Sequence, residues 1–299
     1  MSSDSISDAN AYDAITEASD DARWAFGTGF SDPLAGIDTT VPDGVDGGDL
    51  AAYCLMLGDD ALIMSHRLQQ WCTNAPELED EVALANIGLD LLGQARLLLA
   101  RAGAADGSGR DEDTLAFGRA GHEFGNVRLA ELENGDFGQL ISRLLVFSVW
   151  RLALLARLTG SRDTVLAALA AKGVKEVTYH RDYAAQWLIR LGDGTSFSRE
   201  RAQAGLTEIW PFVAELFAPH PVEERLAAAG AGVDPAGLRM EFDQVMGQVL
   251  ALATLAEPDV AARAGVSGRT GRDGVHTEAM GFLLAEMQSI ARAHPGATW

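Results

Sequence analysis

Residues 50–102 read LAAYCLMLGDDALIMSHRLQQWCTNAPELEDEVALANIGLDLLGQARLLLARA, and this stretch decides the fold class. In its first part, apolar residues recur at the i, i+3 and i+4 spacing of a helix, at Leu50, Tyr53, Leu57, Ala61, Met64 and Leu68. Asp49 is the expected N-cap of this helix, which should end near Cys72. Pro76 and the acids after it suit the first turn of a second helix, ending near Ala102. The stretch therefore predicts two long helices joined by a short turn.

The rest of the chain continues in a helical pattern. A third helix is expected over 136–159 and a fourth over 163–191. A crossover of 33 residues, Gly103–Gly135, separates the second helix from the third and contains one short helical piece at 114–132. Further helices are expected at 198–217, 221–229, 235–256 and 275–293. One long crossover between two tightly joined helix pairs is typical of a ferritin-like bundle. We therefore predict an all-α, ferritin-like four-helix bundle with extra C-terminal helices.

The charge balance excludes some classes of function. The 299 residues include 43 acids and 23 bases, for a formal net charge of −20. Binding to nucleic acid or to an anionic membrane needs clustered cations, which the sequence lacks. There is no secretory signal and no run of about 18 apolar residues, so we expect neither export nor a membrane span. Cys54 and Cys72 would lie about 27 Å apart on one helix, too far for a disulfide, which suits a reducing cytoplasm.

Residues 1–48 differ in composition from the remainder. They are rich in Asp, Ser, Gly and Ala, and residues 1–49 carry 11 acids and one base, half of the net charge. We expect residues 1–48 to be a disordered acidic extension and residues 49–299 to be the helical domain. The acidity and the scarcity of lysine also suggest a salty cytoplasm, although a GC-rich genome would equally favour arginine. The salty-cytoplasm hypothesis requires the fold to gain stability between about 0.1 M and 3 M salt, which denaturation at both concentrations would measure.

Ferritin-like bundles often hold two iron ions, and such a site needs a defined set of ligands. Four carboxylates and two imidazoles come from the four helices in the order Glu, Glu-x-x-His, Glu, Glu-x-x-His. The third helix has no Asp, Glu or His between residues 137 and 162, and its charged residues are all arginine. On the second helix Gly93 stands three residues after Asp90, and on the fourth Tyr179 stands three after Glu176. The sequence therefore predicts no complete metal site and no cofactor in this chain.

A set of polar residues nevertheless stays in positions that would face the bundle interior. They are Asp59, Asp90, Gln94, Arg151, Glu176 and His180. A buried carboxylate must be paired or neutralised, and Arg151 is the expected partner of Asp90, so that ion pairs would fill the space of a lost metal site. The alternative is that Asp90 faces solvent or a subunit interface. Glu176 and His180, four residues apart, could share a ligand or form a simple hydrogen-bonded pair.

Several strings in the sequence resemble one known family. The segment LANIGLDLLGQAR at 84–96 is similar to the C-type subunits (PaaC) of bacterial phenylacetyl-CoA epoxidase. So are DEDTLAF at 111–117, KEVTYH at 175–180, QWLIRLGDGT at 186–195, LTEIWPFVAELF at 206–217 and HTEAMGFLLAEMQ at 276–288, together with the final Trp299. The resemblance covers about residues 49–299 and leaves out the acidic extension.

The resemblance implies a role in a multicomponent oxygenase. In this family the A-type subunit is a ferritin-like di-iron protein that inserts one oxygen atom from O2 into the ring of phenylacetyl-CoA, on the route of phenylacetate breakdown. The C-type subunit is implied to be its non-catalytic structural partner in a heterodimer. A small B-type subunit bridges such pairs, and a reductase with FAD and an iron–sulfur cluster supplies electrons from NADPH.

The resemblance also implies that two stretches lie near the CoA-bearing substrate at the subunit interface. The first consists of Glu123, Phe124, Gly125 and Asn126, and the second of Glu224, Arg225 and Leu226. The side chain of Asn126 and the backbone of Gly125 are chemically able to form hydrogen bonds with a ligand.

Two other interpretations stay open. The chain could be a metal-dependent oxygenase in its own right, with an unusual ligand set of Asp59, Asp90, Glu176 and His180. The acid-free third helix argues against this. The chain could also be a helical adaptor with no link to oxygenation, against which the family strings argue. Iron analysis of the isolated chain tests the first alternative, and co-purification with an A-type subunit tests the second.

Overall fold

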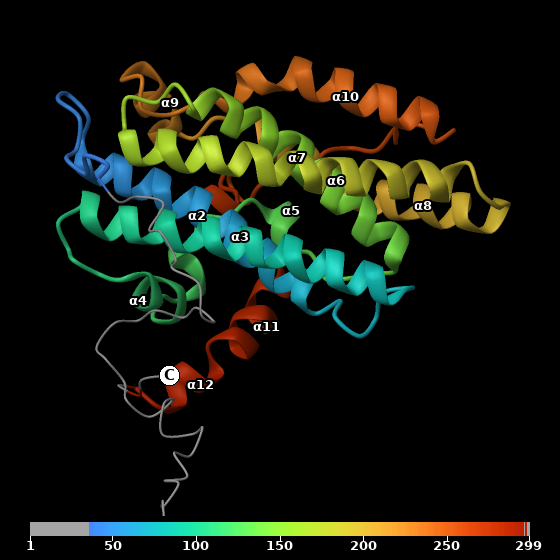
Figure 1. Ribbon diagram of the computed structural model, residues 1–299, viewed down its shortest axis with the longest axis horizontal. Coiled ribbons are helices and arrows are strands. Elements are labelled where there is room, and N and C mark those ends of the chain that lie inside the picture. Colours follow the sequence, from blue (N-terminus) through green and yellow to red (C-terminus); the bar gives the residue numbers. More distant parts are fainter. Residues whose placement is uncertain (1–35, 296, 298–299) are drawn as a thin grey trace, which may run out of the picture. The chain divides into compact units, whose positions relative to one another are not determined.

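Four long helices carry most of the core of the computed structural model, which describes residues 36–295 and 297 (Figure 1). They are α2 (Gly47–Gln69), α3 (Leu78–Ala105), α6 (Phe137–Leu158) and α7 (Thr164–Gly192). α2 packs along α3, α6 packs along α7, and α3 also contacts α7. No strand occurs among the described residues, which confirms the predicted all-α class. The two helix pairs and the crossover between them are consistent with the predicted ferritin-like bundle.

Shorter helices connect or follow these four. They are α4 (Glu112–Phe117), η1 (Gly121–Glu123), α5 (Arg128–Glu131), α8 (Ser196–Ile209), η2 (Trp210–Phe217), α9 (Pro221–Ala228), η3 (Pro235–Leu238), α10 (Arg239–Leu252), η4 (Gly271–Asp273), α11 (Glu278–Met287) and α12 (Ser289–Ala293). The helix expected at 198–217 changes to 3-10 geometry at Trp210. Pro211 has no N–H for an α-helical hydrogen bond, which explains this change.

The first long helix begins earlier than predicted. Asp46, not Asp49, is the N-cap of α2, because its side chain accepts a hydrogen bond from the Asp49 N–H at 2.9 Å. Residues 37–48 belong to the same compact unit as the bundle, and Arg101 donates to the Thr39 carbonyl at 2.6 Å. The helical domain therefore starts near residue 37 rather than at 49. The part of the predicted disordered extension at 1–35 lies outside the described residues.

The third and fourth helices begin where the sequence predicts. Asp136 caps α6 by accepting from the Gln139 N–H at 2.9 Å, and Asp163 caps α7 by accepting from the Leu166 N–H at 2.9 Å. Asp163 is fully buried and also forms an ion pair with Arg101 of α3. This cap therefore holds the start of α7 against the end of α3.

The crossover departs from the prediction of a single helical piece at 114–132. α4 ends at Phe117, and an extended segment at 124–127 separates η1 from α5. Two backbone N–H groups of this segment bind carboxylates of α2, from Gly125 to Asp59 at 2.9 Å and from Val127 to Asp60 at 2.8 Å. Because these N–H groups satisfy buried carboxylates, they are not available for helical hydrogen bonds.

Among the described residues two helices, α3 and α6, are long and apolar enough to cross a membrane by length and composition, although charged residues interrupt both. In α6, 89% of the most apolar window is buried inside the protein, as in the central helix of a packed core. In α3 only 44% of the corresponding window is buried. The core thus accounts for the apolar character of α6 but for only part of that of α3.

Candidate functional site

A chain of polar groups crosses the interior of the bundle and joins all four of its long helices. Arg151 on α6 donates from Nε to Oε1 of Gln94 on α3 at 2.9 Å, and from Nη1 to the Leu57 carbonyl of α2 at 3.3 Å. The Gln94 amide in turn donates to Oε2 of Glu176 on α7 at 2.9 Å. Burial lowers the pKa of Arg151 to about 10, against the opposing charge of Asp60. The guanidinium of Arg151 is therefore the positive charge at the centre of this polar network.

Asp90 pairs with a different residue from the one predicted. Its Oδ2 lies 3.0 Å from Nε2 of His180, while Arg151 binds Gln94, one helical turn further along α3. His180 is buried, and the Asp90 side chain is 38% exposed. The predicted Asp90–Arg151 ion pair is therefore wrong. Glu176 and His180 also take separate partners, since Glu176 binds Gln94 and Lys172.

The four residues proposed as ligands if the chain were itself a metal-dependent oxygenase do not form one cluster. Asp59 forms an ion pair with Arg119, Asp90 pairs with His180, and Glu176 binds Gln94. In the part of the chain that the structure describes, no group of three or more His, Cys, Asp or Glu side chains is arranged to hold a metal ion. The donors inside the bundle do not fit two iron ions, because a guanidinium would repel a cation placed beside it.

Two adjacent carboxylates on α2, Asp59 and Asp60, are fully buried and each is paired with an arginine from another segment. Asp59 binds Arg119 of the crossover, whose Nη1 is 3.0 Å from Oδ2. Asp60 accepts from Nη1 and Nη2 of Arg272 at 3.1 and 3.0 Å, in a bidentate pair. Burial raises the pKa of Asp59, and the charge of Arg119 opposes this shift. Asp60, Arg119 and Arg272 were not among the predicted site residues, although two acids inside the apolar run LMLGDDALIM were a signal for buried ion pairs.

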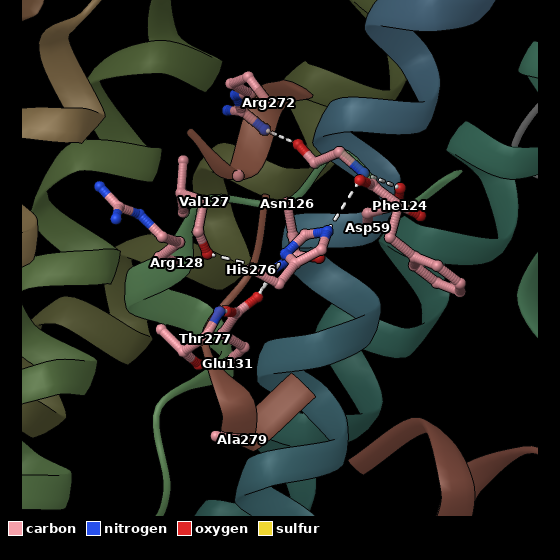
Figure 2. A network of polar contacts seen from close by, with 12 residues as sticks. Asp59, Phe124, Asn126, Val127, Arg128, Glu131, Arg272, His276, Thr277 and Ala279 are labelled. Carbon is pink, nitrogen blue, oxygen red and sulfur yellow. Dashed lines mark hydrogen bonds and ion pairs between the residues drawn. The ribbon is translucent and has the colours of Figure 1, made fainter. Parts of the chain in front are cut away.

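Arg272 of η4 connects three parts of the chain. Besides Asp60, its Nη1 donates to the carbonyls of Met56 at 3.2 Å and Gly125 at 2.9 Å. Its Nε lies 3.7 Å from Oε1 of Glu223 on α9. Figure 2 shows this arginine above the crossover segment. A C-terminal loop residue therefore holds α2, the crossover and α9 together.

Arg272 binds the first of the two stretches expected near a substrate and lies beside Glu223, the residue before the second, and most polar groups of the first stretch are already engaged. Asn126 is fully buried, and its amide donates to Oε2 of Glu131 at 2.9 Å. The N–H and carbonyl of Gly125 bind Asp59 and Arg272. The Gly125 backbone is therefore engaged within the chain, whereas Oδ1 of the buried Asn126 amide has no hydrogen-bond partner among the described residues. Asp59, Glu131 and Arg272 bind the other polar groups of Gly125 and Asn126.

The other residues of the two stretches divide into buried and exposed positions. Phe124 is buried beneath the Arg119 guanidinium, 4.0 Å from the ring centroid, and Leu226 is also buried. Arg225 binds Asp49 with two hydrogen bonds of 2.6 Å. The side chains of Glu123 and Glu224 are exposed. Glu123, Glu224 and the exposed side chain of Arg225 are the parts of the stretches that another molecule can reach.

Glu131 and His276 form the centre of a second buried network, which ties the C-terminal segment to the crossover (Figure 2). His276 Nδ1 lies 2.7 Å from Oε2 of Glu131, and Nε2 lies 3.0 Å from the Phe124 carbonyl. The N–H of Thr277 donates to the other oxygen of Glu131 at 2.5 Å. Burial disfavours a charged ring here, but the hydrogen bond and charge of Glu131 raise the pKa of His276 above its ordinary value.

A surface pocket of about 490 Å³ opens beside this network. Its lining includes Glu133, Phe212, Arg263, Thr277 and Phe282. None of the residues expected near the substrate lines it. The pocket is therefore separate from the two predicted stretches.

Comparison with known proteins identifies relatives of nearly the whole described chain. The model of a family described as Phenylacetic acid catabolic protein, and named PaaA_PaaC, matches residues 39–299. The C-type subunit of the 1,2-phenylacetyl-CoA epoxidase of Escherichia coli (strain K12) is 45% identical over 251 residues, which cover 84% of this chain and 99% of that protein. The family match begins ten residues before the predicted start of the domain, in agreement with the compact unit that starts at Ile37.

Proposed function

The chain belongs to the family of phenylacetic acid catabolic proteins, and from this premise we propose that it is the C-type subunit of a phenylacetyl-CoA epoxidase. In this role it is a non-catalytic structural subunit that pairs with the di-iron A-type subunit and stabilises it during aerobic phenylacetate breakdown. A small B-type subunit bridges such pairs. The complex works in the cytoplasm with a reductase that carries FAD and an iron–sulfur cluster and takes electrons from NADPH.

One observation carries the non-catalytic part of this proposal. Arg151 and Gln94 occupy the bundle interior, where a di-iron protein needs carboxylates from facing helices. Arg151 binds the Gln94 amide oxygen and the Leu57 carbonyl there, and its positive charge opposes the binding of a metal ion beside it. We therefore assign the iron, and the oxygen chemistry that iron supports, to the A-type partner. Glu123, Glu224 and Arg225 are the exposed residues of the two stretches at which we propose that the CoA-bearing substrate and the partner approach.

We expect this chain to co-purify with an A-type subunit from a co-expressing cell, with the iron in the A-type chain only. The measurement is metal analysis of each separated chain, together with turnover of phenylacetyl-CoA by the reconstituted complex. Stoichiometric iron in the isolated chain, with turnover by that chain alone, would show that it is an oxygenase itself. No binding to any A-type subunit would favour the adaptor interpretation.

The variant Asp90→Asn tests the alternative that this chain is itself a metal-dependent oxygenase. Asp90 belongs to the alternative ligand set but lies partly exposed at the edge of the bundle. We expect the turnover of the complex to stay within about twofold of the original, since partly exposed positions contribute little to stability. A loss of turnover with unchanged assembly would instead indicate a catalytic role for this chain.

A further inference from the structure

Asn134 and Gly135 form the one Asn-Gly pair of this sequence, at the turn between α5 and α6. The other asparagines are followed by alanine, isoleucine or valine. The backbone nitrogen after an asparagine can attack its side-chain amide most easily when the next residue is glycine, which has no Cβ in the way and the freest backbone. Asn134 is partly exposed and Gly135 is exposed, so water reaches this pair.

The amide oxygen of Asn134 is bound by a buried cation. Arg143 of α6 donates from Nη2 to Oδ1 of Asn134 and from Nη1 to the Leu132 carbonyl. When a nucleophile adds to the amide carbon, negative charge forms on Oδ1, and a guanidinium at this oxygen stabilises that charge as an oxyanion hole does. The contact with Arg143 therefore makes the side-chain carbon of Asn134 more open to attack.

Arg143 binds only uncharged oxygens within the described part of the chain. It is fully buried, and its two partners are a backbone carbonyl and a side-chain amide. Its Nε has no hydrogen-bond partner among the described residues. Burial and the nearby charge of Arg67 lower the pKa of Arg143 to about 9. A buried charge without a partner is costly, so a carboxylate beside this guanidinium would stabilise the fold.

We propose that Asn134 is a site of deamidation and that the carboxylate formed there takes Arg143 as its counter-ion. The backbone nitrogen of Gly135 forms a bond to the side-chain carbon of Asn134 and loses its proton. The bond from that carbon to Nδ2 breaks, and Nδ2 takes up a proton and leaves as ammonia. Water then opens the cyclic imide at either carbonyl and leaves aspartate or isoaspartate. The net reaction consumes one water and releases one ammonia, with no oxidant or reductant.

Gln139 limits the rate of this reaction. Its Oε1 accepts a hydrogen bond from the Gly135 N–H at 2.9 Å, so the attacking nitrogen is held in the closed turn. A Cβ at position 135 would lie 3.0 Å from Cδ of Gln139, so the missing side chain of Gly135 also makes room for this contact. The nitrogen can attack only after the hydrogen bond opens. Deamidation in the folded chain therefore follows local opening of the turn.

The product loses two hydrogen bonds and gains charge pairing. Nδ2 of Asn134 donates to the Arg67 carbonyl at 2.9 Å and to Oε1 of Gln70 at 3.1 Å, and a carboxylate can donate neither bond. Nη1 of Arg67 donates to the same Gln70 oxygen at 3.0 Å, so a second guanidinium stands near the new carboxylate. Hydrogen bonds between charged groups are roughly twice as strong as neutral ones, so we expect the pairing with Arg143 to outweigh the loss.

The reaction is tested by ageing the purified full chain at mildly alkaline pH and mapping its peptides by mass spectrometry. We expect the mass increase from exchange of NH2 for OH at Asn134 before it appears at exposed Asn74, with isoaspartate at the same position. Gln139→Ala should raise the rate about two- to tenfold, the factor that corresponds to one neutral hydrogen bond. In urea that unfolds the chain, the original chain should react faster and the effect of Gln139→Ala should disappear. A rate at Asn134 no higher than at Asn74, or the same rate in the folded and unfolded chain, would overturn the proposal.

The charge pairing is tested separately with Asn134→Asp. We expect this variant to melt at a higher temperature than the original chain. The pKa of its new carboxyl, measured by NMR, should lie below the ordinary value of aspartate, because a guanidinium faces it. The matched control is Asn74→Asp, which adds the same charge at an exposed position and should leave the melting temperature nearly unchanged. A lower melting temperature for Asn134→Asp, with an ordinary carboxyl pKa, would show that Arg143 is not the counter-ion.

Discussion

Replacement of Arg272 by methionine is expected to lower the free energy of unfolding by about 3–5 kcal/mol, as for the loss of one partner from a buried ion pair. Arg272 is buried, and its side chain binds the carboxylate of Asp60 with two hydrogen bonds. Burial works against its charge, but Asp60 and Glu223 raise the pKa of Arg272 above its ordinary value. Methionine keeps much of the volume and leaves both carboxylates buried without a cation. Urea denaturation of the two proteins measures the difference.

A double-mutant cycle separates the ion pair from the packing. Asp60→Asn combined with Arg272→Met should cost less than the sum of the single changes, because the unpaired charge of Asp60 is then gone and only that of Glu223 remains. Arg239→Met is the matched control, since Arg239 forms an exposed i, i+4 pair with Asp243. Such exposed pairs contribute about 0–1 kcal/mol. A loss below about 1 kcal/mol for Arg272→Met would show that the pair does not stabilise the fold.

The main helices could be predicted from the sequence because apolar spacing and capping acids are local signals. Asp136 and Asp163 begin α6 and α7 as expected. The start of α2 was placed three residues late because Asp46 and Asp49 are both good capping residues. Only the backbone conformation decides between them, and it is extended at Asp46.

Partner choice inside the bundle could not be predicted in the same way. Asp90 and Gln94 stand one turn apart on the same side of α3, so either could meet Arg151 from a neighbouring helix. The choice depends on the axial shift between α3 and α6, and one turn corresponds to about 5.4 Å. Apolar spacing indicates which face is buried but not this shift. The absence of acids from α6, by contrast, could be recognised directly from the sequence, and the structure places Arg151 in the interior as expected.

The crossover was mispredicted because its structure depends on distant residues. Its composition permits a helix, but Asp59 and Asp60 take hydrogen bonds from Gly125 and Val127. Two buried carboxylates need several donors each, and an extended segment supplies N–H groups that a helix would use internally. The polar core of α2 therefore determines the path of the crossover and of the Arg272 loop around it. The segments expected near the substrate are positioned by this core rather than by local preference.

Replacement of Glu131 by glutamine is expected to have the second large effect, and its size should depend on pH. Both ring nitrogens of His276 face acceptors, Glu131 at 2.7 Å and the Phe124 carbonyl at 3.0 Å. A neutral ring has only one N–H, so an ionised Glu131 favours the doubly protonated ring. Near pH 6, the change should cost about 3–5 kcal/mol, because it removes the carboxylate from a buried pair. Near pH 8.5 the cost should be smaller, because a neutral ring can accept from the new amide.

The sign of the pH dependence follows from the direction of the pKa shift. Glu131 raises the pKa of His276 above that of the unfolded chain, so the folded state binds more protons between the two values. The contribution of the pair is complete below about pH 6.5 and disappears as the pH rises through the raised pKa. The difference in unfolding free energy between the original chain and Glu131→Gln should therefore shrink as the pH rises. Urea denaturation at both pH values measures it, with His122→Gln as the exposed-histidine control. A difference that stays constant or grows with pH would show that His276 does not carry the proton assigned to it.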